Sequence, residues 1–465
     1  MNLRLPEWYR TPMAQVVLVG IVCFATVGMF SAVSNLGAGG TQDTALSDMS
    51  NGVLYGMFAL SGLVSGGINN LLGPRLTLFI GSLGYSLYIG SLWCYQKQGT
   101  RWFPVFAGGV LGMSAALLWS AQGSIMMSYP LEKNKGKAFG IFWAIFQFGS
   151  FIGSIIALAI NIRSGKLSSV SNTTYLAFVI IMFMGTASTM LIQPPQTIIR
   201  EDHTLVKFQK HSSPREELRG FVEVLKDKRI LLLLPMFFAS NYFYAYQGAV
   251  NAFYFDGPTR ALNGALEGAG SITGALIIGF FILDNNRLTR RRRGFLALTV
   301  VSVLTIVVWS AALGWQVKFD RSPRNKVHYT HSKYGTKAAL FFFFFFADAS
   351  YQALAYWIMG AISNDPFTLA RFTGVYKAVQ SLGGAVSFVM DAVSTPFLNE
   401  LLVSWILLLV SLPLAGIVIS GIKDTSYTEE APVYATKEGL GEGNLTEIKY
   451  ENPEANVHED VCRLP

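Results

Sequence analysis

Several polar side chains recur within an otherwise apolar stretch, residues 230–255, at a spacing that places them on one face of a helix. They are Ser240, Tyr244, Gln247 and Asn251. Because successive helical residues are rotated by about 100°, these four positions fall within about 60° of one another. We expect this polar face to line a central cavity and to bind a polar solute or ion. The alternative role is hydrogen bonding to a neighbouring helix.

Ionisable side chains occur in three further apolar stretches, although such groups are unfavourable in a membrane unless they have a partner, water or a function. Asp348 lies about 15 Å inside its stretch at 1.5 Å per residue, and Gln352 follows one turn later. Lys377 and Gln380 share a face of another predicted helix, and Glu267 lies near the outer end of a third. Asp348 and Lys377 have three alternatives: a structural ion pair, a pair that couples protons or substrate, or no contact. Asp348 and Glu267 are also candidate proton carriers.

Twelve long apolar stretches hold these side chains. Each is close to the roughly 20 residues that a helix needs to cross a hydrocarbon layer of about 30 Å. Runs of this length indicate helices and not barrel strands, because a helix satisfies its own backbone hydrogen bonds in lipid. The sequence therefore predicts an all-α membrane protein with twelve transmembrane helices. The stretches are residues 12–34, 52–72, 76–95, 103–128, 138–160, 175–192, 230–255, 262–283, 295–315, 338–362, 372–396 and 401–422.

Composition and charge support a multi-pass integral membrane protein. Hydrophobic residues make up 51% of the chain and charged residues 14%, against about 25% charged residues in a typical soluble domain. With a cytosolic N-terminus, 25 of the 36 Lys and Arg residues fall on the cytosolic side, as the positive-inside rule requires. The net charge of +8 therefore reflects topology, and we expect the lipid bilayer and no nucleic acid as a partner. Both termini are predicted to be cytosolic, in the plasma membrane or in an endomembrane such as the vacuole.

Two outer loops carry further signals. Asn172-Thr173-Thr174 is a glycosylation sequon in a loop assigned to the outer or luminal face, so Asn172 is the predicted glycosylation site. Residues 316–337 place six basic residues on the same face. This loop is an exception to the charge rule, which long loops obey weakly.

A charged segment divides the predicted helices into two sets of six. The linker shows an amphipathic helical pattern from Pro214 onward, which is typical of a helix at the membrane surface. The tail lacks apolar periodicity and is predicted to be disordered. We expect a cytosolic N-terminus at residues 1–11, a six-helix bundle at 12–193, a cytosolic linker at 194–229, a second six-helix bundle at 230–422 and an acidic cytosolic tail at 423–465.

A short internal repeat relates the two bundles. Gly-Ile-Phe-Trp-Ala-Ile at 140–145 matches Gly-Val-Tyr-Lys-Ala-Val at 374–379, and Gly149 and Gly383 follow in register. Parallel six-helix repeats about an axis along the membrane normal are the architecture of major facilitator transporters. We therefore expect two pseudo-symmetric six-helix bundles with the major facilitator fold.

The loop at residues 66–75 reads Gly-Gly-Ile-Asn-Asn-Leu-Leu-Gly-Pro-Arg and resembles a loop signature of the major facilitator superfamily. The resemblance implies that Gly66 and Gly73 permit a tight turn. It also implies that Asn70 and Arg75 belong to a gating network at the cytosolic mouth. Asn70 stands where an acidic residue is usual, which weakens the charge pair of that gate.

Further motifs resemble the fungal branch of the uncoordinated-ninety-three-like (Unc-ninety-three-like) family within that superfamily. They include Tyr-Arg-Thr-Pro at 9–12, Leu-Trp-Ser-Ala-Gln-Gly at 118–123, Met-Ser-Tyr-Pro at 127–130 and Asn-Asp-Pro at 364–366. The resemblance covers roughly residues 5–422 and implies the fold more strongly than a mechanism. Animal members of this family are known as an ion-channel-associated subunit and as a trafficking companion of innate immune receptors. Some fungal members are presumed metabolite exporters.

No catalytic or cofactor-binding motif accompanies these features. The chain contains no GxxxxGK, GxSxG or HExxH sequence, and its three cysteines form no paired or metal-binding pattern. We expect no enzyme activity, no cofactor and no metal. The sequence predicts a secondary transporter that moves a small organic solute or ion by alternating access, with proton-coupled metabolite efflux as the favoured mode. The alternative is a non-transporting protein that regulates or accompanies a membrane-protein partner.

Overall fold

The structure is a computed structural model that describes residues 6–35, 44–164, 172–202, 204–206, 213–322, 325–427 and 433–434. Its membrane-spanning elements are α-helices, two of which continue through a π-helical turn. The elements are η1 Glu7–Arg10, α1 Pro12–Cys23, η2 Phe24–Gly28 (π), α2 Met29–Asn35, α3 Thr44–Leu72, α4 Pro74–Gln98, α5 Trp102–Ser128, η4 Glu132–Asn134, α6 Lys135–Ser164, α7 Asn172–Ser188, η5 Thr189–Leu191, η6 Pro195–Thr197, β1 Thr204–Leu205, α8 Pro214–Lys226, α9 Lys228–Ala239, α10 Tyr244–Tyr254, α11 Gly257–Ile277, η7 Ile278–Leu283 (π), α12 Arg290–Gln316, α13 Gly335–Ile362, α14 Pro366–Ala392, α15 Phe397–Ser420 and β2 Val433–Tyr434.

Among the described residues, ten helical segments are long and apolar enough to cross a membrane. Two further spans complete the twelve that the sequence predicts. One is α14, which is 27 residues long but carries Arg371, Lys377 and Asp391. The other consists of α9 and α10, which follow each other across a short break. The predicted twelve-helix fold is therefore confirmed.

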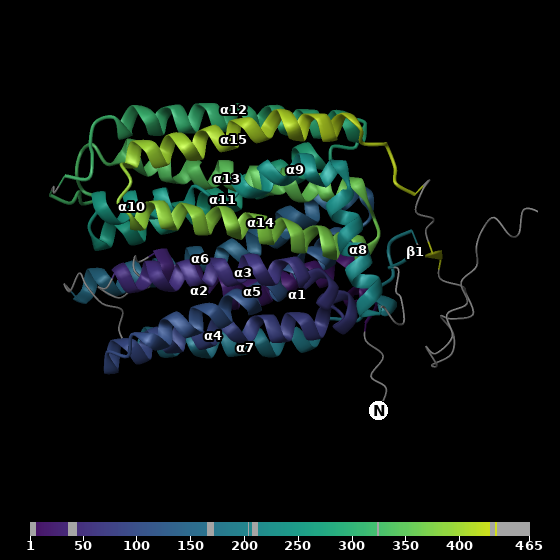
Figure 1. The fold of residues 1–465 in the computed structure, drawn as a ribbon, viewed down its shortest axis with the longest axis horizontal. Coiled ribbons are helices and arrows are strands. Elements are labelled where there is room, and N and C mark those ends of the chain that lie inside the picture. Colours follow the sequence, from purple (N-terminus) through teal and green to yellow (C-terminus); the bar gives the residue numbers. More distant parts are fainter. Residues whose placement is uncertain are drawn as a thin grey trace, which may run out of the picture.

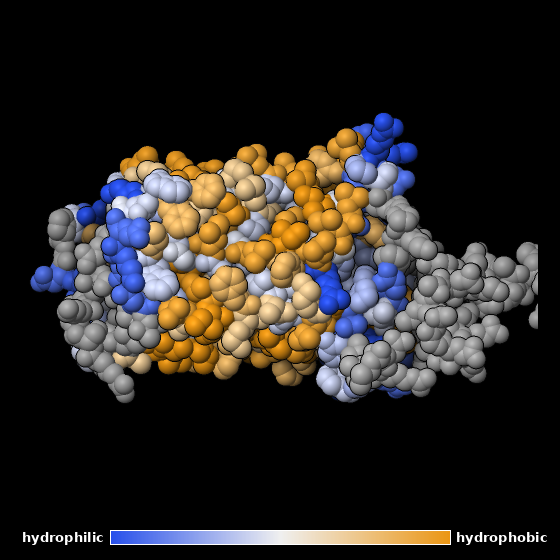
Figure 2. All heavy atoms as spheres, turned by 90° about the horizontal axis from the view of Figure 1, so that it is seen from below, coloured by the Kyte–Doolittle hydropathy of each residue, from blue (hydrophilic) through white to orange (hydrophobic). Residues whose placement is uncertain are grey.

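Large apolar side chains cover the sides of the molecule. Figure 2 shows a hydrophobic belt around its middle, with hydrophilic residues gathered toward the two ends. Exposed large apolar residues of the membrane-spanning elements include Leu60 on α3, Met184 on α7, Phe281 on η7 and Val307 on α12. In water this surface would be unfavourable, whereas in a bilayer it faces the acyl chains.

The two six-helix halves form two layers, with α1–α7 in one and α9–α15 in the other (Figure 1). Across the boundary, α3 packs against α14 and α6 packs against α11. Since α3 and α11 are the second spans of their halves and α6 and α14 are the fifth, the two contacts are equivalent. The predicted pseudo-symmetry is therefore present in the packing.

The internal repeat lies at these equivalent contacts. A Cβ atom on Gly140 of α6 would lie 3.0 Å from the carbonyl oxygen of Ala275 on α11. A Cβ atom on Gly374 of α14 would lie 2.8 Å from the carbonyl oxygen of Gly62 on α3. The repeated glycine thus allows close approach of the two halves at both crossings, as small residues do between membrane helices.

The molecule has two distinct ends, seen at the right and left of Figure 1. We call the end that carries α8 and the β1–β2 pair the termini end. The opposite end carries the described parts of the connection from α12 to α13, residues 317–322 and 325–334, and we call it the loop end. These names are used below without assigning either end to a cellular side.

Helix α8 forms within the linker. Ser213 caps its N-terminus in a reciprocal arrangement with Glu216. One face, with Glu217, Gly220 and Val224, is buried, and α8 contacts both α3 and α14. Leu218, Val222 and Leu225 are exposed. The linker helix therefore bridges the two halves at the termini end.

The helix predicted over 230–255 is broken, which corrects the expectation of one continuous polar face. α9 ends at Ala239, residues 240–243 form a turn, and α10 begins at Tyr244. Pro235 inside α9 lacks a backbone N–H group, which weakens this part of the helix. Gln352 Nε2 donates to the carbonyl oxygen of Ser240 at 3.1 Å. A side chain thus satisfies backbone that the break exposes, as membrane interiors require.

The acidic tail is described only in part. Val433–Tyr434, within the region predicted to be disordered, pairs antiparallel with Thr204–Leu205. Residues 428–432 and 435–465 lie outside the described residues.

Candidate functional site

A cavity of about 1270 Å³ lies between the two halves. Its wall includes residues of α3, α5 and α6 from the first half and of α10, α13 and α14 from the second. The lining extends to Asn51, Lys326 and Ser394 at the loop end. Of the side chains predicted for a substrate pathway, the cavity is lined by Tyr244, Gln247, Asn251, Glu267, Gln352, Lys377 and Gln380.

Ser240 and Asp348, the other two predicted residues, do not line this cavity. Both are buried behind it. Gln380 Nε2 donates to Ser240 Oγ at 2.8 Å, and Tyr244 Oη donates to Asp348 Oδ2 at 2.9 Å. Ser240 and Asp348 therefore lie behind the cavity wall and form hydrogen bonds to two side chains that line it.

A chain of hydrogen bonds connects two helices, α13 and α14, beside the cavity. Lys377 Nζ donates to Gln380 Oε1 at 2.8 Å, and Gln380 Nε2 donates to Gln352 Oε1 at 3.1 Å. Gln352 Nε2 in turn donates to Asp348 Oδ1 at 3.3 Å. We call these four residues the amide relay. Among the described residues no direct ion pair joins Asp348 to Lys377, so the relay is their connection.

Aromatic rings surround the ammonium group of Lys377. Its Nζ atom lies 4.2 Å from the ring centroid of Trp119 on α5, 4.9 Å from that of Tyr376 and 5.4 Å from that of Tyr356. The side chain is only 3% exposed. Cation–π attraction stabilises a charged group in such surroundings. Because Trp119 belongs to the first half and Lys377 to the second, this contact also crosses the boundary between the halves.

A second group of polar side chains includes Asn251 of the cavity lining and the neighbouring Asn263 and Tyr334. Asn263 Nδ2 donates to Asn251 Oδ1 at 2.8 Å, and Tyr334 Oη donates to Asn263 Oδ1 at 2.7 Å. Gln247 Oε1 is buried without a hydrogen-bond partner among the described residues. Glu267 is 6% exposed and lines the same cavity. The structure thus brings Glu267 into the cavity but not into the amide relay.

At the termini end, the loop signature joins both halves to the linker helix. A Cβ atom on Gly66 would lie 2.6 Å from the carbonyl oxygen of Ala370 on α14. Gly73 has a φ of 80°, which a residue with a side chain adopts at a steric penalty. Arg75 donates through Nη2 to the carbonyl oxygen of Met190. Arg75 therefore contacts η5, the turn that follows α7, within its own half.

Glu217 of the linker helix is a functional candidate that the sequence did not indicate. Asn70 Nδ2 donates to Glu217 Oε2 at 2.9 Å and to the carbonyl oxygen of Phe367 at 3.2 Å. Arg371 of α14 donates to both oxygens of Glu217 at 2.9 Å. The linker thus supplies a carboxylate next to the position where the loop signature has an amide. Because the chain separation from Asn70 to Glu217 is 147 residues, no local pattern could reveal this pairing.

Asp284 in the second half occupies a position equivalent to that of Asn70 in the first half. Like Glu217, it was not predicted from the sequence. It accepts hydrogen bonds from the backbone N–H groups of Gly136 at 2.9 Å and Lys137 at 2.6 Å, in the first turn of α6. Burial raises the pKa of Asp284 to about 6, although these hydrogen bonds lower it. In the first half, Asn70 follows Gly66 by four residues, whereas in the second half Asp284 follows Gly279 by five. This spacing is the sequence signal for the site. The π-helical turn η7 accommodates the additional residue.

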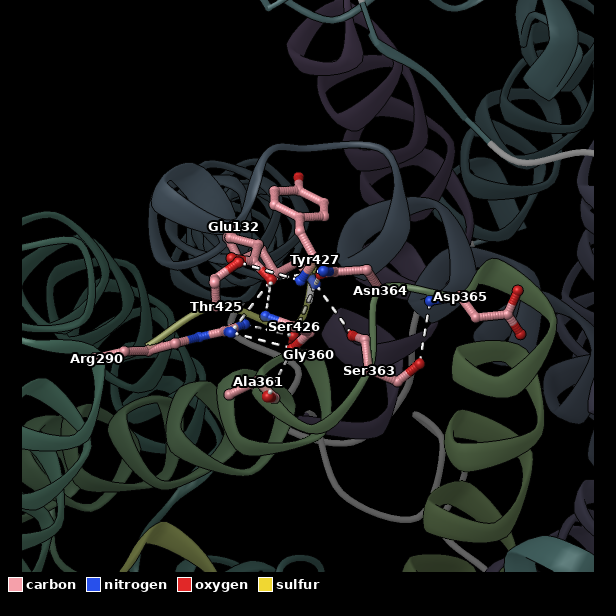
Figure 3. Close-up of polar contacts among 11 residues, drawn as sticks. Glu132, Arg290, Gly360, Ala361, Ser363, Asn364, Asp365, Thr425, Ser426 and Tyr427 are labelled. Carbon is pink, nitrogen blue, oxygen red and sulfur yellow. Dashed lines mark hydrogen bonds and ion pairs between the residues drawn. The ribbon is translucent and has the colours of Figure 1, made fainter. Parts of the chain in front are cut away.

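A third contact closes the boundary at the termini end (Figure 3). Glu132 Oε1 accepts from Arg290 Nη1 at 3.2 Å, from Asn364 Nδ2 at 2.5 Å and from the backbone N–H of Ser426 at 2.9 Å. Lys135 Nζ donates to the carbonyl oxygen of Gly360 at 2.7 Å. Glu132 and Lys135 belong to the first half, and their partners follow from the second. We call this set the termini-end network.

Asn172 lies at the first residue of α7 and is exposed. Its Oδ1 atom accepts a hydrogen bond from Trp93 Nε1 at 3.0 Å. The predicted sequon is therefore at the loop end, on the opposite side from the termini-end network. Among the described residues, no group of three or more His, Cys, Asp or Glu side chains is placed to hold a metal ion.

The helices and the central cavity are arranged as in the major facilitator fold of membrane proteins. Solved structures agree: a fucose:proton symporter from E. coli superimposes with a TM-score of 0.61 at 11% identity, covering 88% of this chain and 98% of that one. The family model described as ion channel regulatory protein UNC-93 matches residues 48–420. The chain belongs to the UNC-93 family.

Two relatives show the same assignment. An UNC93-like protein of Schizosaccharomyces pombe is 40% identical over 418 residues, which covers 88% of this chain and 82% of the relative. UNC93-like protein 1 of Arabidopsis thaliana is 36% identical over 419 residues, which covers 89% of this chain and 91% of the relative. The resemblance inferred from the motifs is therefore confirmed.

Proposed function

We propose that this protein is a secondary transporter that moves a small organic solute across a membrane by alternating access. The observation that carries the proposal is the cavity of about 1270 Å³ between the halves, whose lining extends to the loop end. At the other end the termini-end network joins the halves. A cavity of this size is ample for a small organic molecule. If the loop end closed and the termini end opened, a solute bound in the cavity would be carried across the membrane.

The termini end is assigned to the cytosol in this proposal. The support is the sequence-based count, in which 25 of 36 Lys and Arg residues fall in segments predicted to be cytosolic. The structure would then represent a state that faces outward or toward a lumen. Asn172, at the loop end, would then lie on the outer or luminal face and be available for glycosylation.

Proton movement through Asp348 or Glu267 is the proposed source of energy. Asp348 is buried and linked to Lys377 through the amide relay, so its charge state acts on the cavity wall. Glu267 lines the cavity directly. Efflux of a metabolite is the proposed direction.

A second candidate function is regulation of a membrane-protein partner without transport. Two observations favour it: the description of the matching family model, and Asn70 in place of an acid in the loop signature. The carboxylate of Glu217 beside Asn70 weakens the second argument, because a charge is still present at that gate.

Vesicles containing the purified protein discriminate between the two functions. Uptake and efflux are measured across a panel of metabolites, with and without a proton gradient. We expect at least one solute to move, and Asp348→Asn to abolish its coupling to the gradient. Asp320→Asn, on an exposed carboxylate of the loop end, is the matched control and should retain transport. Stoichiometric co-purification with another membrane protein, together with no movement of any solute, would rule out the transporter.

A further inference from the structure

The cavity has a chemical bias that points to a class of substrate, and this inference rests on the proposed function. We propose that the substrate is an organic anion with a flat aromatic body, whose anionic group contacts Lys377 at the base of the cavity. Three features support it: the unpaired ammonium group, the excess of basic residues and the aromatic walls.

Lys377 has hydrogen-bonding capacity that the described residues do not use. An ammonium group has three N–H donors. One donates to Gln380 Oε1 at 2.8 Å, and the other contacts are the faces of Trp119, Tyr376 and Tyr356. No carboxylate among the described residues forms an ion pair with it. A buried cation without an anionic partner is unfavourable, and an anionic ligand in the cavity would supply that partner.

Basic residues outnumber acidic ones on the cavity wall. The charged residues of the lining are Arg260, Arg321, Lys326, Lys377, Glu267 and Asp391. Arg321 forms ion pairs with two carboxylates, because its Nη2 atom lies 2.6 Å from Asp391 Oδ1 and 2.7 Å from Glu400 Oε1. This cluster has a formal charge of −1, and together with the other charged residues of the lining the formal sum is +1. Glu267 is then the acid that faces the three remaining cations. The lining therefore favours an anion over a cation.

Two of these cations lie together near the loop end. Lys326 Nζ donates to the carbonyl oxygen of Ala252 at 3.0 Å, and Arg260 Nε is buried without a partner among the described residues. Burial and the neighbouring Arg260 lower the pKa of Lys326 from its usual value, and Asp256 opposes this shift. Two cations that repel each other at an entrance attract anions and raise their local concentration.

Aromatic side chains from both halves form the walls above Lys377. Tyr55 of α3 stacks on Phe388 of α14 with ring centroids 5.3 Å apart and an interplanar angle of 22°. Trp119 and Trp143 line the opposite part with centroids 6.2 Å apart. Such surfaces bind flat apolar bodies by offset stacking and by burial of apolar area. A body of this kind with one anionic group matches both the walls and the base.

The competing explanation is that Lys377 only ties the halves together through Trp119. A matched set of probes separates the two: naphthalene carboxylate, its neutral carboxamide and the cationic naphthylmethylammonium. Their dissociation constants are measured by calorimetry on the purified full chain. We expect the carboxylate to bind roughly tenfold or more tightly than the carboxamide, and the ammonium probe to bind most weakly.

Lys377→Met should remove the preference, so that carboxylate and carboxamide bind within about twofold of each other. The ratio of the two constants is insensitive to the fraction of folded protein. Lys318→Met, an exposed basic residue of the loop end outside the cavity lining, should leave the ratio unchanged. If Lys377→Met does not fold, Lys326→Gln provides the second test: the association rate of the carboxylate should fall and that of the carboxamide should not.

Equal binding of the three probes, binding of none, or a preference that survives in Lys377→Met would each overturn the anion proposal. Its failure is distinguishable from failure of the transporter proposal. Movement of neutral or cationic solutes in the vesicle experiment, without any anion preference, would leave transport standing and remove the anion site. A carboxylate preference dependent on Lys377, without movement of any solute, would leave the site and remove transport.

Discussion

The carboxylate of Asp348 and the ammonium of Lys377 do not contact each other. They are connected by hydrogen bonds through two glutamine side chains. Each amide in the relay donates toward Asp348 and accepts from the side of Lys377. All three hydrogen bonds therefore point the same way, and the charges at the two ends polarise the amides between them. Of the alternatives left open by the sequence, direct pairing is absent, and an indirect connection takes its place.

Breaking the relay should destabilise the protein. Gln380→Met leaves Lys377 Nζ without its amide acceptor and Gln352 Oε1 without the donor from Gln380. Each lost partner of a buried polar group is expected to reduce the free energy of unfolding by about 1–3 kcal/mol. The measurement is the midpoint of thermal unfolding in detergent. Gln98→Met, at the exposed end of α4, is the control. Equal shifts for both variants would contradict a structural role for the relay.

Removing the charge of Glu132 should open the termini end. Glu132→Gln loses the ion pair with Arg290, one of several hydrogen bonds that join the halves there. Loss of a charge-assisted hydrogen bond, about 1.5–3 kcal/mol, corresponds to a tenfold or greater shift toward the open form. Distances between spin labels at Leu72→Cys and Arg287→Cys report the opening. Glu201→Gln, an exposed partner of Lys133, should leave the distance distribution unchanged.

Exchanging the charge between Asn70 and Glu217 tests the docking of the linker helix. Asn70→Asp replaces a donor by a second carboxylate 2.9 Å from Glu217 Oε2, so α8 should loosen. Adding Glu217→Gln restores one donor and one acceptor, and should reverse the effect. Hydrogen exchange of the α8 backbone should become on the order of tenfold faster in the single variant. Glu223→Gln, in an exposed pair with Arg219, is the control. A double variant no better than Asn70→Asp would refute the pairing.

The crossing of α3 and α14 should tolerate no side chain at Gly66. Gly66→Ala would place Cβ 2.6 Å from the Ala370 carbonyl oxygen, so the closed packing must yield. We expect the spin-label distance at the termini end to lengthen. Gly56→Ala on the same helix meets nothing within 4 Å and should behave as the wild type. Wild-type distances in Gly66→Ala would show that the crossing adapts without opening.

Closure of the termini end should depend on pH through Asp284. Its pKa is about 6 in the structure and 3.8 when unperturbed, so the closed form binds the proton more tightly than a form in which this carboxyl is hydrated. Lowering the pH from 6 toward 4 should therefore favour closure, by at most tenfold per pH unit. Above pH 6 the effect should level off. Asp284→Asn should abolish the dependence in this window, whereas Glu201→Gln should retain it. A dependence unchanged in Asp284→Asn would assign it to another group.

The sequence predicted the twelve spans because each is an apolar run long enough for a helix to cross the hydrocarbon layer of a membrane. It also predicted pseudo-symmetry, since Gly140 and Gly374 are part of a visible repeat. The break between α9 and α10 was not predictable from the polar spacing, because Ser240 and Tyr244 remain four residues apart whether or not the helix is continuous. Pro235 weakens the helix locally, and the exposed backbone at the break is satisfied by the Gln352 side chain, which comes from another helix.

Site residues that depend on tertiary contacts were found only in part. The individual polar residues of the cavity were evident as unusual groups in apolar stretches. Their order in the relay was not, because Asp348, Gln380 and Lys377 meet only when α13 and α14 pack together. Asp284 was hidden by the one additional residue of the π-helical turn, and Glu217 by its position on a surface helix. Asp284 could have been predicted from a shifted copy of the loop at residues 66–75 in the second half, whereas Glu217, on the linker helix, has no such local signal.

The polypeptide that follows α15 is part of the closure between the halves. Ser426 contributes its backbone N–H to Glu132, and Val433–Tyr434 pairs with Thr204–Leu205. A purification tag or fluorescent reporter joined directly after Ser420 would remove both attachments and bias the conformational equilibrium of the engineered protein. Joined beyond Tyr434, the same reporter would preserve them, and its signal could follow the native cycle.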